Sequence, residues 1–317
     1  MSADELKNLI IYTGVYMPPE GDKDRKIYEN RSPIWFETFD NAQRLGIKLV
    51  VRNDGGLPEE MLKRIKGYEN ITIVEKDPLK KNTLGGGRRE ALQKAIDIAK
   101  EDGISNPVFL WTEPEKDDLI TEKALLPLVR EVNAGTNIAV AERKEEAWAQ
   151  LPPFQRWIER RANKRANQAV PQDSDKPEGE LDFWFAPRAF DKTGAKYFLA
   201  YNSDKGRLDL WDAIFVPIID AIKAGEKVRG VPLNFLYNEI QINNESDESN
   251  REIKIKRMEQ YAQILKELGD KKWEEFFEDS KAQLEEIKKI NKENPEDKTE
   301  LLKEAKKSLW KNVFRLK

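Results

Sequence analysis

The chain has 317 residues, of which 39% are hydrophobic and 36% are charged, and it contains neither cysteine nor histidine. This length allows one large domain, or one domain with an appendage, and the two missing residue types exclude disulfides, thiol chemistry and histidine as a base or metal ligand. The 55 basic and 58 acidic residues give a net charge of -3, a balance that argues against nucleic acid as the main partner.

No transmembrane segment and no secretion signal are predicted. The longest apolar runs are far shorter than the roughly 18 to 20 residues that cross a membrane, and the first ten residues lack the basic, apolar and small-residue regions of a signal peptide. We therefore expect a cytoplasmic protein, in which any catalysis uses carboxylates, lysine, arginine, tyrosine or hydroxyl groups.

Strand-like and helix-like segments alternate through the first 143 residues. Short apolar runs predict strands at residues 9–12, 47–51, 71–74, 108–111 and 137–141. Helices are predicted at residues 33–45, 58–67 and 121–133, with a further helix opened by Arg88 and Arg89. Ser32 is expected to cap the first of these helices, and Pro33 to be its first residue. The alternation predicts an α/β fold with a mostly parallel sheet and helices on both faces.

The second half of the chain is less regular. Residues 147–167 form a long, aromatic and basic segment that predicts a helix broken near Pro152. Strands are predicted at residues 181–186 and 227–237, with a helix at 213–224 between them, and Pro232 suits the edge of a sheet. From residue 250 the sequence is rich in lysine and glutamate. It predicts a helical appendage that packs on the sheet or on another subunit of a homo-oligomer, with helices at residues 251–268, 271–291 and 298–314.

The stretch from residue 82 to residue 120 carries the clearest functional pattern. Three consecutive glycines, residues 85–87, end a loop and let backbone N–H groups approach an anion, and Arg88 and Arg89 lie where a helix N-terminus is already electropositive. The pattern predicts a phosphate site, although a tight turn followed by a solvated helix face explains the same residues. It has neither the GxxxxGK[ST] pattern of a P-loop nor a complete GxGxxG, so it indicates a different nucleotide-binding arrangement.

Carboxylates follow two of the predicted strands. Glu113 and Glu115 come directly after the strand at residues 108–111, and Asp54 follows the strand at residues 47–51. Ligands bind at the carboxyl ends of strands in open α/β sheets, and carboxylate oxygens are the ligands that Mg²⁺ and Mn²⁺ prefer. The two glutamates therefore predict a metal ion that carries a diphosphate. Salt bridges to basic helices are the alternative for them, and a plain turn is the alternative for Asp54.

The order of these landmarks resembles the GT-A class of glycosyltransferases, in particular the family-2-like nucleotide-sugar enzymes and the mannosylglycerate-synthase type. The resemblance covers about residues 9–241 and implies a Rossmann-like fold. It places one group of residues where they contact the base, ribose or diphosphate of a nucleotide-diphosphate sugar, the donor. These residues are Tyr12, Thr13, Gly14, Asn53, Asp54, Gly86, Gly87, Arg88 and Arg89. The charge of Lys116 is expected to add to that of the two arginines at the phosphates.

In that class an acidic D-x-D element holds a divalent cation against the diphosphate, and the Glu-Pro-Glu of residues 113–115 stands in its place. Many members add a histidine ligand near the last strand, where this chain has Tyr-Asn-Glu at residues 237–239. The resemblance thus implies Mg²⁺ or Mn²⁺ at Glu113 and Glu115. Without the histidine, metal binding is weakened, rebuilt by other ligands, or lost.

The class also carries an acidic pair on the acceptor side, which Asp209 and Asp212 match. In an inverting enzyme one of them is the general base toward the acceptor hydroxyl, and in a retaining enzyme the pair orients sugar and acceptor. The sequence does not decide between the two. For Asp209 the alternative is an acid that is stabilised by the dipole at a helix N-terminus.

These residues lead to one expected function and one alternative. We expect a glycosyltransferase, of the hexosyltransferase kind, that moves a sugar from a nucleotide-diphosphate sugar to a hydroxyl of a small molecule or glycan. Its domain spans residues 1–249, with a nucleotide-sugar half at 1–143 and an acceptor half at 144–249, followed by the appendage at 250–317. The alternative is a non-catalytic nucleotide-sugar-binding protein with a helical interaction tail. A sugar-phosphate nucleotidyltransferase is disfavoured, because no glycine-rich signature follows the first strand.

Overall fold

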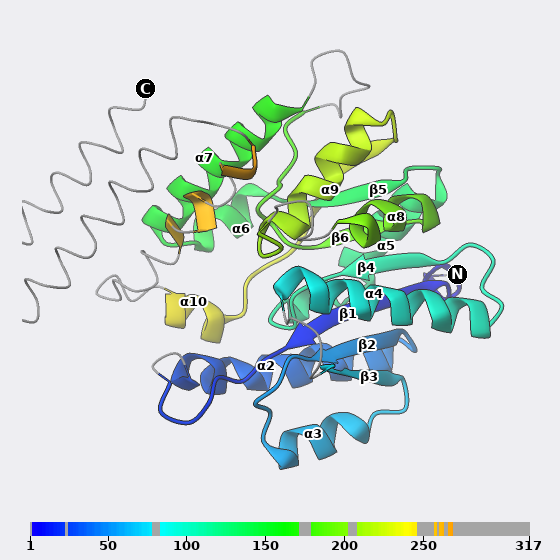
Figure 1. Cartoon of the computed structure of the whole chain (residues 1–317), viewed down its shortest axis with the longest axis vertical. Helices are drawn as coiled ribbons and strands as arrows, with labels where there is room; N and C mark the ends of the chain where they lie inside the picture. Colours follow the sequence, from blue (N-terminus) through cyan, green and yellow to red (C-terminus); the bar gives the residue numbers. More distant parts are fainter. Residues whose placement is uncertain are drawn as a thin grey trace, which may run out of the picture.

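The structure is a computed structural model that describes residues 2–22, 25–77, 83–170, 179–201, 208–245, 257–258, 260–262 and 266–268. These residues form one seven-stranded sheet in the order β3-β2-β1-β4-β6-β5-β7, with helices on both faces (Figure 1). The strands are β1 (Leu9–Val15), β2 (Lys48–Asn53), β3 (Ile71–Glu75), β4 (Val108–Trp111), β5 (Ile138–Arg143), β6 (Arg188–Phe190) and β7 (Val228–Leu233). Strand β6 runs antiparallel to β4 and β5, and the other pairings are parallel. The predicted α/β, Rossmann-like architecture is confirmed.

Two hydrophobic cores lie on opposite faces of the sheet. The first core contains side chains of α1 (Ser2–Leu6), α2 (Arg25–Arg44), α3 (Glu59–Lys66), α5 (Glu122–Asn133) and α6 (Glu145–Gln150). The second contains side chains of α4 (Leu84–Glu101), α7 (Pro153–Ala169), α8 (Lys192–Ala200) and α9 (Asp212–Lys223). Ile10 of β1 belongs to the second core and Ile11 to the first. The central strands are apolar on both faces for this reason, which is why they appear as continuous apolar runs in the sequence.

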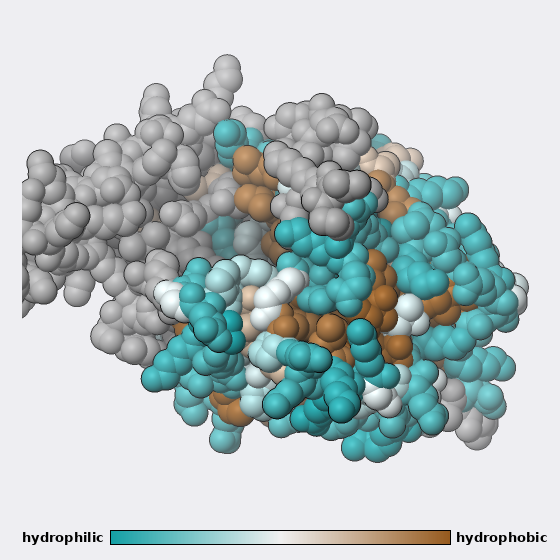
Figure 2. Space-filling model, turned by 60° about the horizontal axis from the view of Figure 1, so that its bottom comes forward, coloured by the Kyte–Doolittle hydropathy of each residue, from teal (hydrophilic) through white to brown (hydrophobic). Residues whose placement is uncertain are grey.

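The surface is mostly hydrophilic on the face shown in Figure 2, with a patch of hydrophobic residues near its centre. Four large hydrophobic side chains among the described residues are exposed, namely Tyr16, Leu84, Leu236 and Ile240. Two of these, Tyr16 and Leu84, lie at the carboxyl edge of the central strands, where the candidate site is found.

Helix α2 begins earlier than predicted, and Pro33 lies inside it instead of at its start. Proline has no N–H to donate to the carbonyl four residues before it, which here is the carbonyl of Glu29. The Ser32 hydroxyl donates a hydrogen bond of 2.9 Å to that carbonyl. Ser32 therefore compensates for the proline within the helix, and its predicted role as N-cap is wrong.

The predicted strand at residues 181–186 is also wrong, because these residues form a loop before the short strand β6. The guanidinium of buried Arg188 donates to the carbonyls of Phe183 and Pro187, at 2.7 and 2.8 Å, and also to that of Phe185. The Asp182 carboxylate accepts the N–H of Phe185 at 3.2 Å. The backbone groups of residues 183 and 185 thus bond to side chains, whereas the Pro187 carbonyl, next to β6, also accepts an N–H of β5, that of Ala141 at 3.2 Å.

The remaining elements of the second half mostly follow the prediction. Helices α6 and α7 are separated at Leu151 and Pro152, as the proline pair indicated. Strand β7 is an edge strand and contains Pro232. Helix α8 was not predicted, although Asp191 caps it by accepting the Gly194 N–H at 2.8 Å, a signal that the sequence contains.

Most of the predicted appendage lies outside the described residues, including the helices predicted at 271–291 and 298–314 and most of the one at 251–268. Within the described part, Met258 and Tyr261 pack against Ile158 and Ala162 of α7. The division of the chain at residue 250 and a subunit contact through this region stay predictions. None of the described helices is long and apolar enough to span a membrane.

Candidate functional site

A pocket of about 140 Å³ lies where the carboxyl ends of β1, β2 and β4 meet the first turn of α4. Six of the residues predicted from the sequence line it, namely Gly14, Asp54, Gly87, Arg88, Glu113 and Glu115. They come from four separate segments, and the parallel arrangement of β1, β2 and β4 brings those segments to one edge of the sheet. This edge is where ligands bind in open α/β sheets.

The three glycines lie in the first turn of α4 and not in a loop, since the helix begins at Leu84 with Thr83 as its N-cap. The Gly86 N–H donates to the Thr83 hydroxyl, and the Gly87 N–H donates to the Thr83 carbonyl, both at 3.0 Å. The Gly85 N–H donates to the Asp209 carbonyl at 2.9 Å. The backbone N–H groups that the sequence suggested for an anion are therefore bonded within the protein.

The glycines are instead required for the close approach of two carboxylates to the helix. A Cβ atom at Gly85 would clash with Asp209 Oδ1, and one at Gly87 would lie 2.8 Å from Asp54 Oδ1. Negative charge at a helix N-terminus is favourable because of the helix dipole. The glycines thus place Asp54 and Asp209 on either side of the first turn of α4.

Arg88 and Arg52 are the two basic residues that line the pocket, and Arg88 is the one on α4. Its guanidinium carbon lies 4.9 Å from the Trp111 ring and 5.6 Å from the Trp211 ring, and Nη1 donates to the Leu210 carbonyl at 3.1 Å. Desolvation lowers the pKa of Arg88 to about 10, against the opposing effect of Glu113 and other acids. Arg88 therefore remains a cation at neutral pH, and its Nε has no hydrogen-bond partner among the described residues.

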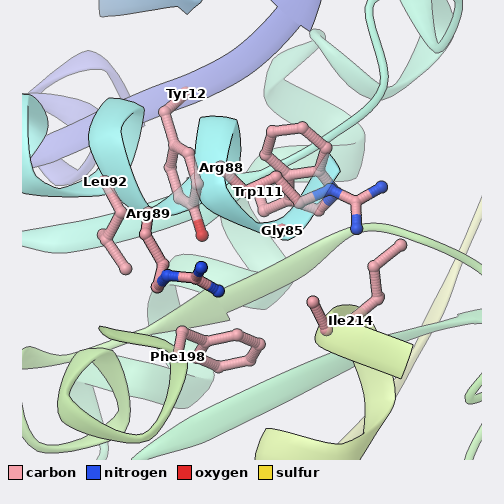
Figure 3. Close-up of a pocket in the computed structure, with 9 residues that line it drawn as sticks. Tyr12, Gly85, Arg88, Arg89, Leu92, Trp111, Phe198 and Ile214 are labelled. Carbon is pink, nitrogen blue, oxygen red and sulfur yellow. The ribbon is translucent and has the colours of Figure 1, made fainter. Parts of the chain in front are cut away.

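Arg89 points to a smaller cavity of about 20 Å³ behind the pocket. Figure 3 shows Arg88 beside Trp111, whereas Arg89 extends toward Phe198. Two hydrogen bonds join Arg89 to Asp209, Nη1 to Oδ1 at 2.6 Å and Nη2 to Oδ2 at 2.8 Å. Arg88 and Arg89 thus differ in role, and only Arg88 lines both cavities.

The two predicted catalytic aspartates are buried and bonded within the protein. Asp209 accepts from Arg89 and from the Thr83 hydroxyl. Asp212 accepts the N–H groups of Asp209 and Leu210, at 2.9 and 2.6 Å, and a hydrogen bond from the Tyr201 hydroxyl. Neither aspartate lines either of the two cavities described here. The role of general base stays a prediction for both, and the contacts favour the alternative of a structural acid beside a helix.

Asp54 lines the pocket from the end of β2. Desolvation raises its pKa, while Arg52 and Arg88 oppose the shift. Asp54 Oδ1 is 3.7 Å from Arg52 Nε, and neither atom has a hydrogen-bond partner among the described residues. Asn53, in contrast, shapes the turn, because Oδ1 accepts the Gly55 N–H at 3.0 Å and Nδ2 donates to Glu75 at 2.7 Å.

Glu113 and Glu115 lie in a turn just beyond β4, as the sequence predicted. Lys116 lies behind this turn and outside the pocket, since it is buried with Nζ 3.5 Å from the Glu113 carboxylate and 3.4 Å from Gln241 Oε1. Lys116 Nζ also lies 4.6 Å from the centre of the Tyr237 ring. Its predicted contact with phosphate therefore stays a prediction, and its observed contacts connect the turn to residues 237–241.

A protein usually supplies one or two carboxylates to a Mg²⁺ ion, and waters and substrate phosphates complete the coordination. Glu113 and Glu115 match this number and type of ligand. Desolvation raises the pKa of Glu115, and the nearby charge of Glu113 raises it further, so a cation between them is electrostatically favoured. No group of three or more acidic side chains gathers as a metal site in the part of the chain that the structure describes. Because Mg²⁺ keeps several waters and binds substrate phosphates, two carboxylates suffice when a diphosphate supplies further oxygens.

The remaining predicted residues belong to β1. Tyr12 is buried, lines the smaller cavity and points its hydroxyl toward it (Figure 3), and burial raises its pKa. The Thr13 hydroxyl is buried without a hydrogen-bond partner among the described residues. Gly14 lines the pocket, and a Cβ atom there would lie 3.1 Å from Asp54 Oδ2. Strand β1 thus lies beneath both cavities, with Tyr12 at the smaller one and Gly14 at the pocket.

Several buried polar atoms at the pocket have no hydrogen-bond partner among the described residues. They are Trp35 Nε1, Arg52 Nε, Asp54 Oδ1, Arg88 Nε and Trp111 Nε1. Such atoms are rare in native proteins, and an ordered water or a polar ligand in this pocket provides their partners. Sequence reasoning missed Trp35 and Trp211, which reach the pocket from α2 and from the segment before α9. The sequence gives a signal for Arg52, because it directly follows the apolar residues of β2, two positions before Asp54.

No protein-family model matches this sequence, and no curated protein matches it. The solved structures that it resembles include S. aureus TarS, with 10% identity and a TM-score of 0.43 over 81% of this chain and 70% of that chain. Another is a 4-diphosphocytidyl-2C-methyl-D-erythritolsynthase from Anaerococcus prevotii, with 13% identity and a TM-score of 0.40 over 77% and 99%. A third is a nucleoside-diphosphate-sugar pyrophosphorylase from Vibrio cholerae, with 9% identity and a TM-score of 0.38 over 71% and 91%.

Similarities this low carry no argument about the activity of this chain. The α/β architecture itself is established by the sheet and helices described above. The resemblance to the mannosylglycerate-synthase type of glycosyltransferase stays a prediction.

Proposed function

We propose that the chain is a glycosyltransferase that moves a sugar from a nucleoside-diphosphate sugar to an acceptor hydroxyl group. The observation that carries the proposal is the pocket at the carboxyl ends of β1, β2 and β4, which Arg88, Glu113 and Glu115 line together. A cationic side chain next to two carboxylates suits a metal-bound diphosphate, because the anion needs both direct donors and a cation shared with the protein.

The reaction breaks the bond between the anomeric carbon and a diphosphate oxygen, which leaves with the electron pair. A new bond forms between that carbon and the acceptor oxygen, whose proton is released. Negative charge grows on the leaving group, and groups aimed at that charge accelerate the step. Arg88 is placed to bind the leaving diphosphate from α4. A cation held by Glu113 and Glu115, when bound, supplies Lewis-acid stabilisation of the same charge.

The aromatic residues of the pocket support a ligand with a flat or apolar part beside its charged part. Tyr16, Trp35, Trp111 and Trp211 line the same pocket as Arg88. Aromatic rings offer apolar faces for a flat group, and the indole N–H groups of Trp35 and Trp111, which have no partner among the described residues, can donate to a polar group. A nucleoside joined to a diphosphate has this combination of an aromatic base, hydroxyl groups and charge.

The experiment uses the full-length chain and follows its melting temperature with UDP-, GDP-, ADP- and CDP-sugars, each with and without Mn²⁺. A ligand that binds the folded state raises the melting temperature by mass action. We expect one nucleotide to give the largest rise, a further gain with Mn²⁺, and release of its nucleoside diphosphate on incubation with sugar and glycan acceptors. No rise with any of the four nucleotides would contradict the proposal.

A non-catalytic nucleotide-sugar-binding protein is the second candidate. One observation favours it, namely that the carboxylates of Asp209 and Asp212 are bonded to the protein's own groups. Saturable binding of a nucleotide sugar, without release of nucleoside diphosphate to any acceptor or to water, would decide for this candidate. Formation of pyrophosphate from a nucleoside triphosphate and a sugar phosphate would instead indicate a nucleotidyltransferase.

A further inference from the structure

Asp209 has an unusual backbone conformation. In the described part of the chain it is the only residue other than glycine with a positive φ, at 60°. This left-handed region is unfavourable for most residues with a side chain, although aspartate and asparagine tolerate it best, and surrounding bonds hold Asp209 there. Asp212 provides them, because its carboxylate accepts the N–H groups of Asp209 and Leu210 at 2.9 and 2.6 Å. We call residues 209–211 the Asp209 turn.

The Asp209 turn is attached to the first turn of α4 by three kinds of bond. Arg89 donates two hydrogen bonds to the Asp209 carboxylate, at 2.6 and 2.8 Å. The Thr83 hydroxyl donates to the same carboxylate, and the Asp209 carbonyl accepts the Gly85 N–H at 2.9 Å. The side chain of Asp209 is 1% exposed, so these bonds are shielded from water and set the position of the turn.

The other two residues of the Asp209 turn contact Arg88. The Leu210 carbonyl accepts a hydrogen bond from Arg88 Nη1 at 3.1 Å, and the Trp211 ring lies 5.6 Å from the guanidinium carbon. Arg88 and Trp211 both line the pocket. A displacement of the turn would therefore move one wall of the pocket and the cation in it.

We infer that Asp209 is a positioning residue that sets Arg88 and Trp211 against the donor diphosphate, and that it does not take the proton of the acceptor. The inference rests on the proposed function, because the diphosphate is the ligand that Arg88 would bind. Both carboxylate oxygens of Asp209 accept hydrogen bonds from Arg89, and Oδ2 also accepts from Thr83. This arrangement leaves the carboxylate no orientation toward an acceptor hydroxyl in the pocket.

The test measures binding of UDP, GDP, CDP and ADP, each with Mn²⁺, to the full chain by calorimetry. Asp209→Asn keeps the size of the side chain and a residue type that tolerates positive φ, but it removes the charge that binds Arg89. We expect it to weaken the preferred nucleoside diphosphate about tenfold, the factor that corresponds to 1.4 kcal/mol. The further loss on adding Asp209→Asn to Arg88→Ala should be smaller than the loss from Asp209→Asn in the wild type, because part of the effect of Asp209 passes through Arg88 and the rest through Trp211.

Variants at Thr83 keep the inference testable if Asp209→Asn fails to fold. Thr83→Val removes the hydroxyl that donates to Asp209 and should weaken the same ligand, whereas Thr83→Ser should restore its affinity. Asp191→Asn is the matched control, since Asp191 also caps a helix by accepting a backbone N–H, but it does not line the pocket. The substitution removes one carboxylate charge at a helix N-terminus but keeps a residue that caps helices, so it should keep the wild-type affinity for the ligand.

The outcomes separate this inference from the proposed function. If the wild-type chain binds none of the four nucleoside diphosphates, both fall. If it binds one of them and Asp209→Asn binds it equally well while turnover with an acceptor is lost, Asp209 is the general base and only the inference falls. Equal losses of ligand affinity in Asp209→Asn and in the Asp191→Asn control would also contradict the inference. Such a result would show that removal of a carboxylate charge beside any helix weakens binding.

Discussion

Replacing Arg88 with alanine should separate ligand binding from folding, because the guanidinium contributes little to the free energy of unfolding. The lowering of its pKa from 12.5 to about 10 corresponds to a cost of about 3 kcal/mol at most for keeping the cation in the folded protein. The hydrogen bond to Leu210 offsets about 1.5 to 3 kcal/mol of this cost. The two tryptophan contacts offset about 0.5 to 1 kcal/mol each. The variant without ligand should therefore melt near the wild-type temperature.

Ligand binding should respond far more strongly to the same change. Loss of one charge-assisted hydrogen bond to phosphate costs about 1.5 to 3 kcal/mol, which raises the dissociation constant about 10- to 100-fold. Calorimetry with the nucleoside diphosphate that gives the largest thermal shift measures this. Arg64→Ala is the matched control, because the Arg64 guanidinium carbon lies 3.8 Å from the Phe36 ring centre but outside the pocket. Equal affinities of the Arg88 and Arg64 variants would refute the reasoning.

Three further substitutions give separate expectations. Glu115→Gln should not lower the melting temperature without ligand, because desolvation and the charge of Glu113 raise the pKa of Glu115, and it should abolish the gain from Mn²⁺; a variant that keeps this gain would place the metal elsewhere. Glu142→Gln should flatten the pH dependence of stability. The pKa of Glu142 is raised to about 7 by desolvation, so between about pH 4.5 and 7 only the unfolded state ionises and the wild type loses stability as pH rises. Urea unfolding at pH 5 and pH 8 should show the variant gaining about 1 to 2 kcal/mol at pH 8, after a discount for partial exposure. Gly85→Ala should destabilise by about 1 to 3 kcal/mol through its clash with Asp209; a gain, usual for this change in a helix, would contradict the contact.

The sequence predicted the sheet well where local pattern alone decides the structure. The central strands are buried on both faces, so their residues form continuous apolar runs that are visible without tertiary information. Residues 181–186 have a similar apolar pattern, LDFWFA, but they form a loop in which the carbonyls of Phe183 and Phe185 accept hydrogen bonds from buried Arg188. No local signal identifies such a bond, because it depends on the tertiary position of the guanidinium.

The sequence predicted the positions of Glu113 and Glu115 correctly, whereas the glycines at residues 85–87 lie in a helix and not in the predicted loop. The position of Glu113 and Glu115 after a buried strand was enough to place them at the edge of the sheet. The glycines suggested an anion loop, whereas they make room for Asp54 and Asp209 beside the helix. An anion loop needs glycines because a ligand approaches the backbone closely, and this helix needs them because two carboxylates do. The sequence alone does not distinguish the two cases. The partners of the Asp209 carboxylate, Arg89 and Thr83, lie more than a hundred residues away along the chain.

The most direct test is a crystal structure of the full chain grown with its preferred nucleoside diphosphate and Mn²⁺, with anomalous diffraction to locate the metal. The account predicts an anomalous peak bound by the carboxylates of Glu113 and Glu115, and a diphosphate that accepts a hydrogen bond from Arg88. A nucleotide bound away from the carboxyl ends of β1, β2 and β4, or a diphosphate in this pocket without contact to Arg88, would contradict it.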